Sequence, residues 1–255
     1  MKTICMFQLT FLFRLLLRRA DVSPNWCCLA LCFMVGIASG AETSTSDQPA
    51  ASSKADPMQV RCIPAAERAG RELGCFITDT TVLGKLPDEP QYWFLDIYAT
   101  RDAAEKAKEK YSTVVESYAK IWLFTISNQN WKASGGQRVA RVGPLPLVGA
   151  SSYTALYMEA TFIPGMHSTA HRHPGPEAWY VLTGEQCLET PGHRMIVRAG
   201  ESGIVPEGPP MMLVGTGTSK RRALVLVLHD SSKSMTSLAP DWKPAELCSE
   251  IKPEA

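Results

Sequence analysis

Short apolar segments separated by glycine and proline fill the second half of the chain. These segments are rich in β-branched and aromatic residues, and no stretch of helical spacing interrupts them. The pattern predicts β-strands at 153–163, 171–173, 178–182, 186–190, 195–198, 203–205, 211–214 and 223–229. Repeated short strands of this kind are typical of a sandwich or a barrel.

The first half of the chain predicts strands together with one amphipathic helix. Residues 75–78, 92–98 and 121–127 are aromatic and β-branched, which favours strands. Between 100 and 120 the apolar positions follow helical spacing, and Thr100 is the expected N-cap. The apolar face expected for this helix consists of Ala103, Ala107, Tyr111, Val114, Val115 and Tyr118.

Residues 1–41 have the layout of a secretory signal peptide. A basic stretch precedes an apolar run at 26–37, and small residues follow it. The run is shorter than the roughly 20 apolar residues of a transmembrane helix, so we expect cleavage and no stable membrane insertion afterwards. A second apolar patch at 11–17 leaves open an upstream start site or an uncleaved anchor. The expected location is periplasmic or secreted.

Composition and charge give no electrostatic reason to expect a nucleic-acid partner. The 255 residues carry a formal net charge of +1, which is too small to create an extended field of one sign. The basic cluster Lys220-Arg221-Arg222 is interpreted as a solvated turn.

The segment after residue 41 contains four cysteines, an even number that suits an oxidising compartment. Three pairings are possible. The simplest joins Cys62 to Cys75 across a short loop and leaves Cys187 to pair with Cys248. Four buried free thiols are the alternative.

Two histidines and a glutamate stand at a spacing that suits a metal site. Gly165 and Gly184 frame the segment, which contains His171, His173 and Glu177. On a strand the two histidines point to the same face, because side chains alternate. A Pro-Gly-Pro segment can then reverse the chain and return Glu177 beside them. Two neutral imidazoles and a carboxylate suit Mn, Fe, Co, Ni or Zn.

This spacing resembles the first motif of the cupin superfamily without a gap or a substitution. Gly200, Pro206 and Gly208 fit the second motif of that family. Family members usually carry a fourth metal ligand, a histidine, two or three residues later. This chain has Met211 and Met212 there, so one ligand of the family pattern is missing.

The resemblance implies an all-β cupin jelly-roll barrel, the double-stranded β-helix, and makes a homodimer the default assembly. The amphipathic helix and the first strands then form an N-terminal α/β extension. We expect this extension to pack on the barrel, although a strand-swapped dimer or a degenerate second barrel half stays open. The expected domains are a signal peptide at 1–41, a disordered linker at 42–57, the extension at 58–139, the barrel at 140–235 and a tail at 236–255.

Several residues near the motif have alternative roles. Met211 or Met212 is either a soft thioether ligand, which would favour copper, or barrel packing. His167 shares strand parity with the two motif histidines and is a candidate surrogate ligand, although a loop histidine is the simpler interpretation. Trp179 shares parity with Glu177 and is expected to line the pocket. His229 is interpreted as structural.

Three functions are compatible with these residues. The first is a metal-dependent enzyme acting on a small organic molecule, with oxygenase or isomerase chemistry in view and catalytic residues unassigned. The second is a non-catalytic cupin that binds a small ligand. The third is a structural cupin with a degenerate metal site, which the missing histidine would allow. Fold alone does not choose among them.

Overall fold

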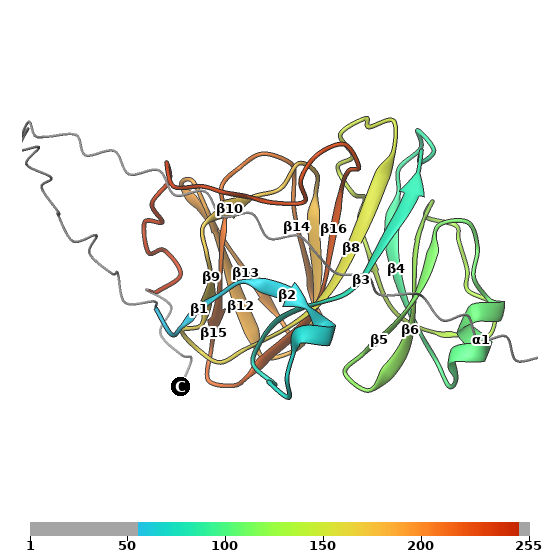
Figure 1. Cartoon of the computed structure of the whole chain (residues 1–255), viewed down its shortest axis with the longest axis horizontal. Helices are drawn as coiled ribbons and strands as arrows, with labels where there is room; N and C mark the ends of the chain where they lie inside the picture. Colours follow the sequence, from blue (N-terminus) through green and yellow to red (C-terminus); the bar gives the residue numbers. More distant parts are fainter. Residues whose placement is uncertain (1–55, 250–255) are drawn as a thin grey trace, which may run out of the picture. The chain divides into compact units, whose positions relative to one another are not determined.

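The computed structural model describes residues 56–249. The expected signal peptide at 1–41 and nearly all of the linker at 42–57 lie outside the described residues. The described part of the chain is built mainly from strands, arranged in sheets of six, five, four and two strands (Figure 1).

The two larger sheets face each other and enclose an apolar core. The six-stranded sheet contains, in spatial order, β14 (Ser202–Val205), β11 (Glu177–Thr183), β16 (Arg221–Asp230), β8 (Tyr153–Phe162), β3 (Gly74–Gly84) and β2 (Cys62–Pro64). The five-stranded sheet contains β1 (Gln59–Val60), β9 (His167–Ser168), β15 (Met212–Thr216), β12 (Glu185–Thr190) and β13 (His193–Arg198). Met158 and Val225 from the larger sheet meet Leu188 and Leu213 from the smaller one in a single buried cluster. The jelly-roll barrel expected from the sequence is therefore present.

A four-stranded sheet covers the outer face of the six-stranded sheet. It contains β5 (Ser112–Ser117), β6 (Lys120–Ser127), β4 (Tyr92–Tyr98) and β7 (Gln137–Val142). In Figure 1 it lies beside β8 and β3, on the side away from β12, β13 and β15. Trp93 and Phe124 from this sheet pack against Tyr157 of β8 in a second buried cluster.

Strand β8 is the wall between the two cores, and all ten of its residues are buried. Its side chains alternate between the two faces, as a pleated strand requires. Leu156 and Met158 point into the barrel, whereas Ala155 and Tyr157 point towards the four-stranded sheet. A strand covered on both faces has apolar residues on both and lacks the alternation that would mark one face as inward.

The helix expected at 100–120 is present but much shorter. Helix α1 spans Arg101–Lys106, and the backbone N–H of Ala103 donates to Oγ1 of Thr100, which confirms the N-cap. The second half of the expected helix is strand β5, so the prediction was wrong there. Thr113, Val114 and Val115 are all buried because both faces of β5 are covered. Consecutive apolar positions in such a strand also satisfy helical spacing.

Both disulfides of the simplest pairing are formed. Cys62–Cys75 joins β2 to β3 across a sequence separation of 13 residues. Cys187–Cys248 joins β12 to the C-terminal segment across 61 residues. Chain-entropy arguments give these loops stabilising contributions of about 3 and about 4 kcal/mol.

Two short segments near the ends of the described residues pair with strands or connections of the barrel. Residues 59–64 bridge the two larger sheets, because β1 pairs with β9 and β2 pairs with β3. Strand β17 (Ser237–Leu238) pairs with β10 (His171–Arg172) in the two-stranded sheet. Each segment is close in sequence to one of the disulfides, which therefore hold these segments in place.

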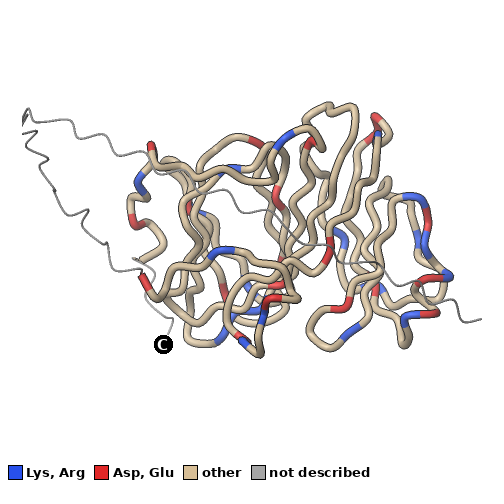
Figure 2. Tube along the Cα trace, viewed as in Figure 1, with Lys and Arg blue, Asp and Glu red and all other residues tan. Residues whose placement is uncertain are grey.

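Charges of both signs occur over the described surface. Figure 2 shows basic and acidic positions interspersed along the trace of the described residues. Among residues 56–249, no helix has the length and apolar character needed to cross a membrane.

Candidate metal centre and ligand cavity

A tight turn brings the two motif histidines and the glutamate together. His171 begins β10, His173 follows that strand directly, and Glu177 begins β11. Gly175, between them, lies so close to β16 that a Cβ atom there would overlap the carbonyl group of Leu228. The chain can therefore reverse within the Pro-Gly-Pro segment, and Glu177 returns beside the imidazoles.

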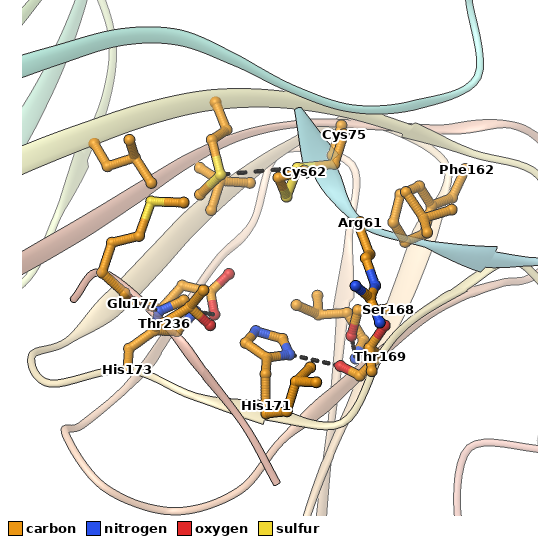
Figure 3. Close-up of a pocket in the computed structure, with 18 of the residues that line it drawn as sticks. Arg61, Cys62, Cys75, Phe162, Ser168, Thr169, His171, His173, Glu177 and Thr236 are labelled. Carbon is orange, nitrogen blue, oxygen red and sulfur yellow. Dashed lines mark hydrogen bonds and ion pairs between the residues drawn. A yellow bond between two sulfur atoms is a disulfide. The ribbon is translucent and has the colours of Figure 1, made fainter. Parts of the chain in front are cut away.

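The potential ligand atoms of the three side chains converge on one point. One such atom from each of His171, His173 and Glu177 lies within 4.8 Å of the others. Nε2 of His173 is 3.4 Å from Oε2 of Glu177, and both of these side chains are buried. Figure 3 shows the three residues together in the lower left of the view. A single cation between them would contact all three.

Hydrogen bonds fix the orientation of both imidazole rings. Nδ1 of His171 lies 2.7 Å from the carbonyl oxygen of Thr169, and Nδ1 of His173 lies 2.6 Å from that of Met235. A carbonyl oxygen can only accept, so each Nδ1 carries the proton and donates it. In a neutral ring this leaves the lone pair on Nε2. Backbone acceptors of this kind commonly orient histidines that bind metals.

Burial and mutual charge shift the pKa values of the three groups in different directions. Burial lowers the pKa of His171, more than the Glu177 carboxylate raises it. Burial also acts to lower the pKa of His173, but the interaction with Glu177 outweighs it and raises that pKa. For Glu177, burial acts to raise the pKa, and the two histidines outweigh it and lower that pKa. Glu177 is therefore ionised and His171 neutral near pH 7, the states that bind cations.

The residues present fit a divalent cation. Oε2 of Glu177 is buried and accepts no hydrogen bond from the described residues. The nearest donor is Nε2 of His173 at 3.4 Å, which pairs with this oxygen only when the ring is protonated. When both rings are neutral, a cation would satisfy the buried charge. Two imidazole nitrogens and one carboxylate oxygen suit Mn, Fe, Co, Ni or Zn.

The structure separates the two methionines at the expected fourth position. Met211 is fully buried and forms an isolated bridge with His171, so their side chains lie on the same face. Met212 lies on the opposite face, where it pairs with Glu189. Met211 therefore occupies the corner beside His171, and Met212 does not.

Trp179 is not among the residues that line the cavity, and His167 is not part of the three-residue cluster. Trp179 is buried in the barrel core but does not line the cavity, because its indole packs over Gly203. His167 is engaged elsewhere, with Nε2 located 3.1 Å from Oδ2 of Asp56. His229 is buried at the end of β16 and lies outside the cluster.

A cavity of about 320 Å³ adjoins the three residues. Its walls are mainly apolar side chains of β8, β15 and β16, and the Cys62–Cys75 disulfide forms part of its lining (Figure 3). Sulfur atoms of Cys75 and Met158 are in contact at 3.7 Å. The size is near the lower end of ordinary small-molecule sites. The cavity lining consists of Val60, Arg61, Cys62, Cys75, Leu156, Met158, Ala160, Phe162, Ser168, Thr169, His171, His173, Glu177, Leu213, Arg221, Val225, Met235, Thr236 and Leu238.

Two arginines and a threonine of this cavity were missed by the sequence analysis. Arg221 was interpreted as part of a solvated turn, which is wrong, because its side chain is only 1% exposed and lines the cavity. Its strand begins two residues earlier than expected and places Arg221 on the inward face with Ala223 and Val225. The position of Arg221 at even spacing from Ala223 and Val225 was the sequence signal for an inward side chain. Arg61 and Thr169 come from short segments whose sequence shows no comparable signal.

Comparison with known proteins identifies one family. The family model described as "Cupin domain" matches residues 158–227. A cupin superfamily protein from Desulfitobacterium hafniense DCB-2 is 16% identical, with a TM-score of 0.28, over 30% of this chain and 68% of that chain. The DMSP lyase DddQ from Ruegeria pomeroyi DSS-3 is 22% identical, with a TM-score of 0.31, over 35% of this chain and 45% of that chain.

An oxalate oxidase solved with the substrate analogue glycolate is 22% identical, with a TM-score of 0.29. That match covers 34% of this chain and 46% of the oxidase. No curated protein matches the chain in sequence. The family match lies on the strands that carry the motif residues and form the barrel, and the chain therefore contains a cupin domain.

Proposed function

We propose that this chain is an exported protein whose cupin domain binds a divalent cation through His171, His173 and Glu177. The cavity beside the cation would hold a small organic molecule. The proposal depends on one observation above the others: both Nδ1 atoms donate to backbone carbonyls, so in their neutral form both rings present an Nε2 lone pair beside the buried carboxylate of Glu177.

The site would suit metal-assisted chemistry on that molecule. A bound divalent cation would supply Lewis acidity, which can polarise a substrate oxygen or activate water or dioxygen. Three protein ligands leave coordination positions open on the cavity side. Thr169 lines the cavity, and its buried hydroxyl has no hydrogen-bond partner among the described residues. The apolar walls limit the access of water.

Binding without turnover is the second candidate function. Among the described residues that line the cavity, the three proposed ligands are the only imidazole or carboxylate groups. No further group of the kind that usually transfers protons therefore faces the cavity from the described part of the chain. This observation favours a metal-assisted binding protein over an enzyme that relies on side-chain acid–base catalysis.

We also propose the domain organisation expected from the sequence. A signal peptide at 1–41 and a linker at 42–57 would precede the extension at 58–139, the barrel at 140–235 and the tail at 236–255. Strands β1, β2 and β3 fall within the extension by these bounds but belong to the two barrel sheets, so the separate layer consists of β4, β5 and β6, with β7 across the boundary. The two disulfides support export to the periplasm or the exterior. The mass of the exported protein would test the cleavage site, and sedimentation would test the expected homodimer.

Metal analysis of the exported protein, purified without a histidine tag, tests the metal site. We expect about one equivalent of a divalent metal and its loss in His171→Ala. His193→Ala is the matched control, because His193 is exposed on β13, outside the cluster, and this variant should keep the metal. A wild-type protein that takes up none of Mn, Fe, Co, Ni or Zn on dialysis would overturn the proposal. It would favour a structural barrel, in which replacing all three residues changes only stability.

A further inference from the structure

Arg221 places a cationic side chain inside the barrel. It is the first residue of β16, it lies opposite Phe162 of β8, and its side chain is only 1% exposed. One terminal nitrogen of the guanidinium donates to the carbonyl oxygen of Ala160 at 3.3 Å, and the other donates to Oε1 of Gln186. Both acceptors are neutral, so neither supplies a counter-charge. The Glu177 carboxylate favours the charged guanidinium through space, but the two groups do not form an ion pair.

The hydrogen-bond capacity of Arg221 is not filled. Its Nε–H group is buried and has no acceptor among the described residues, and the same holds for the side-chain nitrogen of Gln186. The guanidinium forms no ion pair within residues 56–249, whereas the adjacent Arg222 pairs with Glu72 on the other face of the sheet. Burial lowers the pKa of Arg221 to about 10, which still leaves the group charged near pH 7. A buried charge without a partner is strongly unfavourable.

The cavity that Arg221 lines carries an excess of positive charge. Its described lining includes two arginines, Arg61 and Arg221, and one acid, Glu177, which belongs to the candidate metal centre. A divalent cation bound at that centre would increase the excess. Between the metal centre and Arg221 the wall is apolar, with Met158, Ala160 and Val225 among its residues.

We infer that the cavity binds a small organic acid with an apolar body, whose carboxylate pairs with the guanidinium of Arg221. The apolar body lies along β8 and β16, and the opposite end of the molecule faces His171, His173 and Glu177. A carboxylate supplies the missing counter-charge and accepts the free N–H groups, and the planar guanidinium matches its geometry. The orientation of the opposite end rests on the proposed metal centre, whereas the carboxylate subsite does not.

Calorimetric titration tests this inference. The ligands are butanoate, hexanoate and octanoate, and the affinity for each acid is compared with the affinity for the alcohol and the amide of the same chain length. The protein is the exported chain with intact disulfides, measured after loading with Mn²⁺ and after treatment with a chelator. We expect at least one carboxylate to bind about tenfold or more tightly than its neutral partners, since hydrogen bonds to charged groups contribute more than neutral ones. Equal binding of the acid and its neutral partners, or binding of none of the three acids, would overturn the inference.

Arg221→Met should weaken carboxylate binding by about tenfold or more without loss of Mn²⁺ binding, because it removes a positive charge and no proposed metal ligand. Arg222→Met is the matched control, since it removes the same charge from the next residue on the opposite face and should change neither. If Arg221→Met does not fold, Arg221→Lys replaces it, because lysine keeps the charge and loses the planar fork. Unchanged carboxylate affinity in a folded Arg221 variant would contradict the inference.

The two proposals fail separately in this experiment. If the wild type binds no metal and carboxylate binding persists in His171→Ala, the proposed metal centre is contradicted and the carboxylate subsite is supported. Metal binding with no preference for carboxylates would keep the metal centre and remove the subsite. Inorganic phosphate serves as a competitor, and displacement of the acid by phosphate at equal concentration would overturn the assignment to carboxylates.

Discussion

The two imidazoles of the candidate metal centre differ in the ease with which they take up a proton. Both donate through Nδ1 to backbone carbonyls, so a second proton and a metal ion compete for the same Nε2 atoms. Burial lowers the pKa of His171, whereas the interaction with Glu177 raises that of His173. His173 is therefore the first of the two to gain a proton as the pH falls.

The pH dependence of metal affinity follows from that order. Affinity is highest at pH values above the raised pKa of His173, where both rings are neutral. Affinity should fall as the pH passes down through the raised pKa of His173, above the ordinary value of 6.5, and fall more steeply once His171 is protonated below it. Equilibrium dialysis with Mn²⁺ from about pH 8 to about pH 5 measures this. Affinity that stays constant down to about pH 6 would contradict the assignment of His173 as a ligand.

The corner beside His171 gives a second prediction at this scale. Met211→His would place an imidazole on the same face as His171 and complete a set of four ligands. We expect metal affinity to rise at least about tenfold, or roughly 1.4 kcal/mol. Met212→His is the matched control, because Met212 lies on the other face of the sheet, and it should leave affinity unchanged. An equal response of the two variants in calorimetric titration would show that the corner is closed.

Residues of the site that are close in sequence could be predicted, whereas residues brought in by strand pairing could not. His171, His173 and Glu177 could be predicted because one short segment contains them, and alternation along a strand brings them together. Arg221 could not be placed so directly, since its inward position depends on where β16 begins and on its pairing with Phe162 of β8. The role of Arg61 depends on residues 59–64 bridging two sheets, which no local pattern specifies.

At the scale of elements, the turn between β11 and β12 is limited by space as well as by backbone conformation. Gly184 has a φ of 72°, and a Cβ atom there would lie 2.8 Å from the carbonyl oxygen of Lys220. Gly192, in the turn between β12 and β13, also has a φ of 72°, but nothing lies within 4 Å of such an atom. Alanine at Gly192 would therefore lose free energy of unfolding through backbone conformation alone, whereas alanine at Gly184 would lose it through conformation and steric overlap together.

Gly184→Ala should destabilise the protein more than Gly192→Ala does. The left-handed conformation costs an L residue roughly 1–2 kcal/mol at either position. Gly184→Ala additionally forces the turn away from the start of β16, and overpacking of this kind typically adds about 1–3 kcal/mol. Denaturant unfolding of the two variants gives the difference. Equal free energies of unfolding would mean that the turn relaxes without disturbing β16.

Element type was predictable for the longer strands that are rich in aromatic and β-branched residues. The expected strands at 92–98 and 121–127 correspond to β4 and β6, and the expected strand at 153–163 corresponds to β8. The sequence pattern predicts helix where strand β5 lies, because burial on both faces removes the alternation that identifies a strand. Its β-branched run of Thr113, Val114 and Val115 was the signal against a helix. Strands β9 and β17, two residues each, exist only through their pairing partners.

At the scale of the whole described unit, one sheet serves two cores. The inward face of the six-stranded sheet contributes to the barrel core, and its outward face packs on the four-stranded sheet. A buried ionic contact reinforces this join: Glu159 of β8 pairs with Arg68 and accepts hydrogen bonds from the hydroxyl of Ser117 and the backbone N–H of Tyr118. A buried carboxylate satisfied in this way resists separation of the layers, because parting them would leave it unpaired.

The shared sheet predicts that the four-stranded sheet and the barrel with its candidate metal centre unfold together. Phe124 packs between Trp93 of the same sheet and Tyr157 of β8. The distances between ring centroids are 5.4 Å to Trp93 and 5.0 Å to Tyr157. Phe124→Ala should lower the free energy of unfolding by about 3–5 kcal/mol, the usual cost of removing a buried phenyl ring. Guanidinium unfolding followed by tryptophan fluorescence and by release of bound Mn²⁺ should show both midpoints moving by the same amount. Val82→Ala, at a position 70% exposed on β3, should move neither. In the contrary outcome, the fluorescence midpoint of Phe124→Ala falls while the midpoint of metal release stays at its wild-type value. That result would show that the barrel is stable without the layer that covers it, and that the two cores are independent.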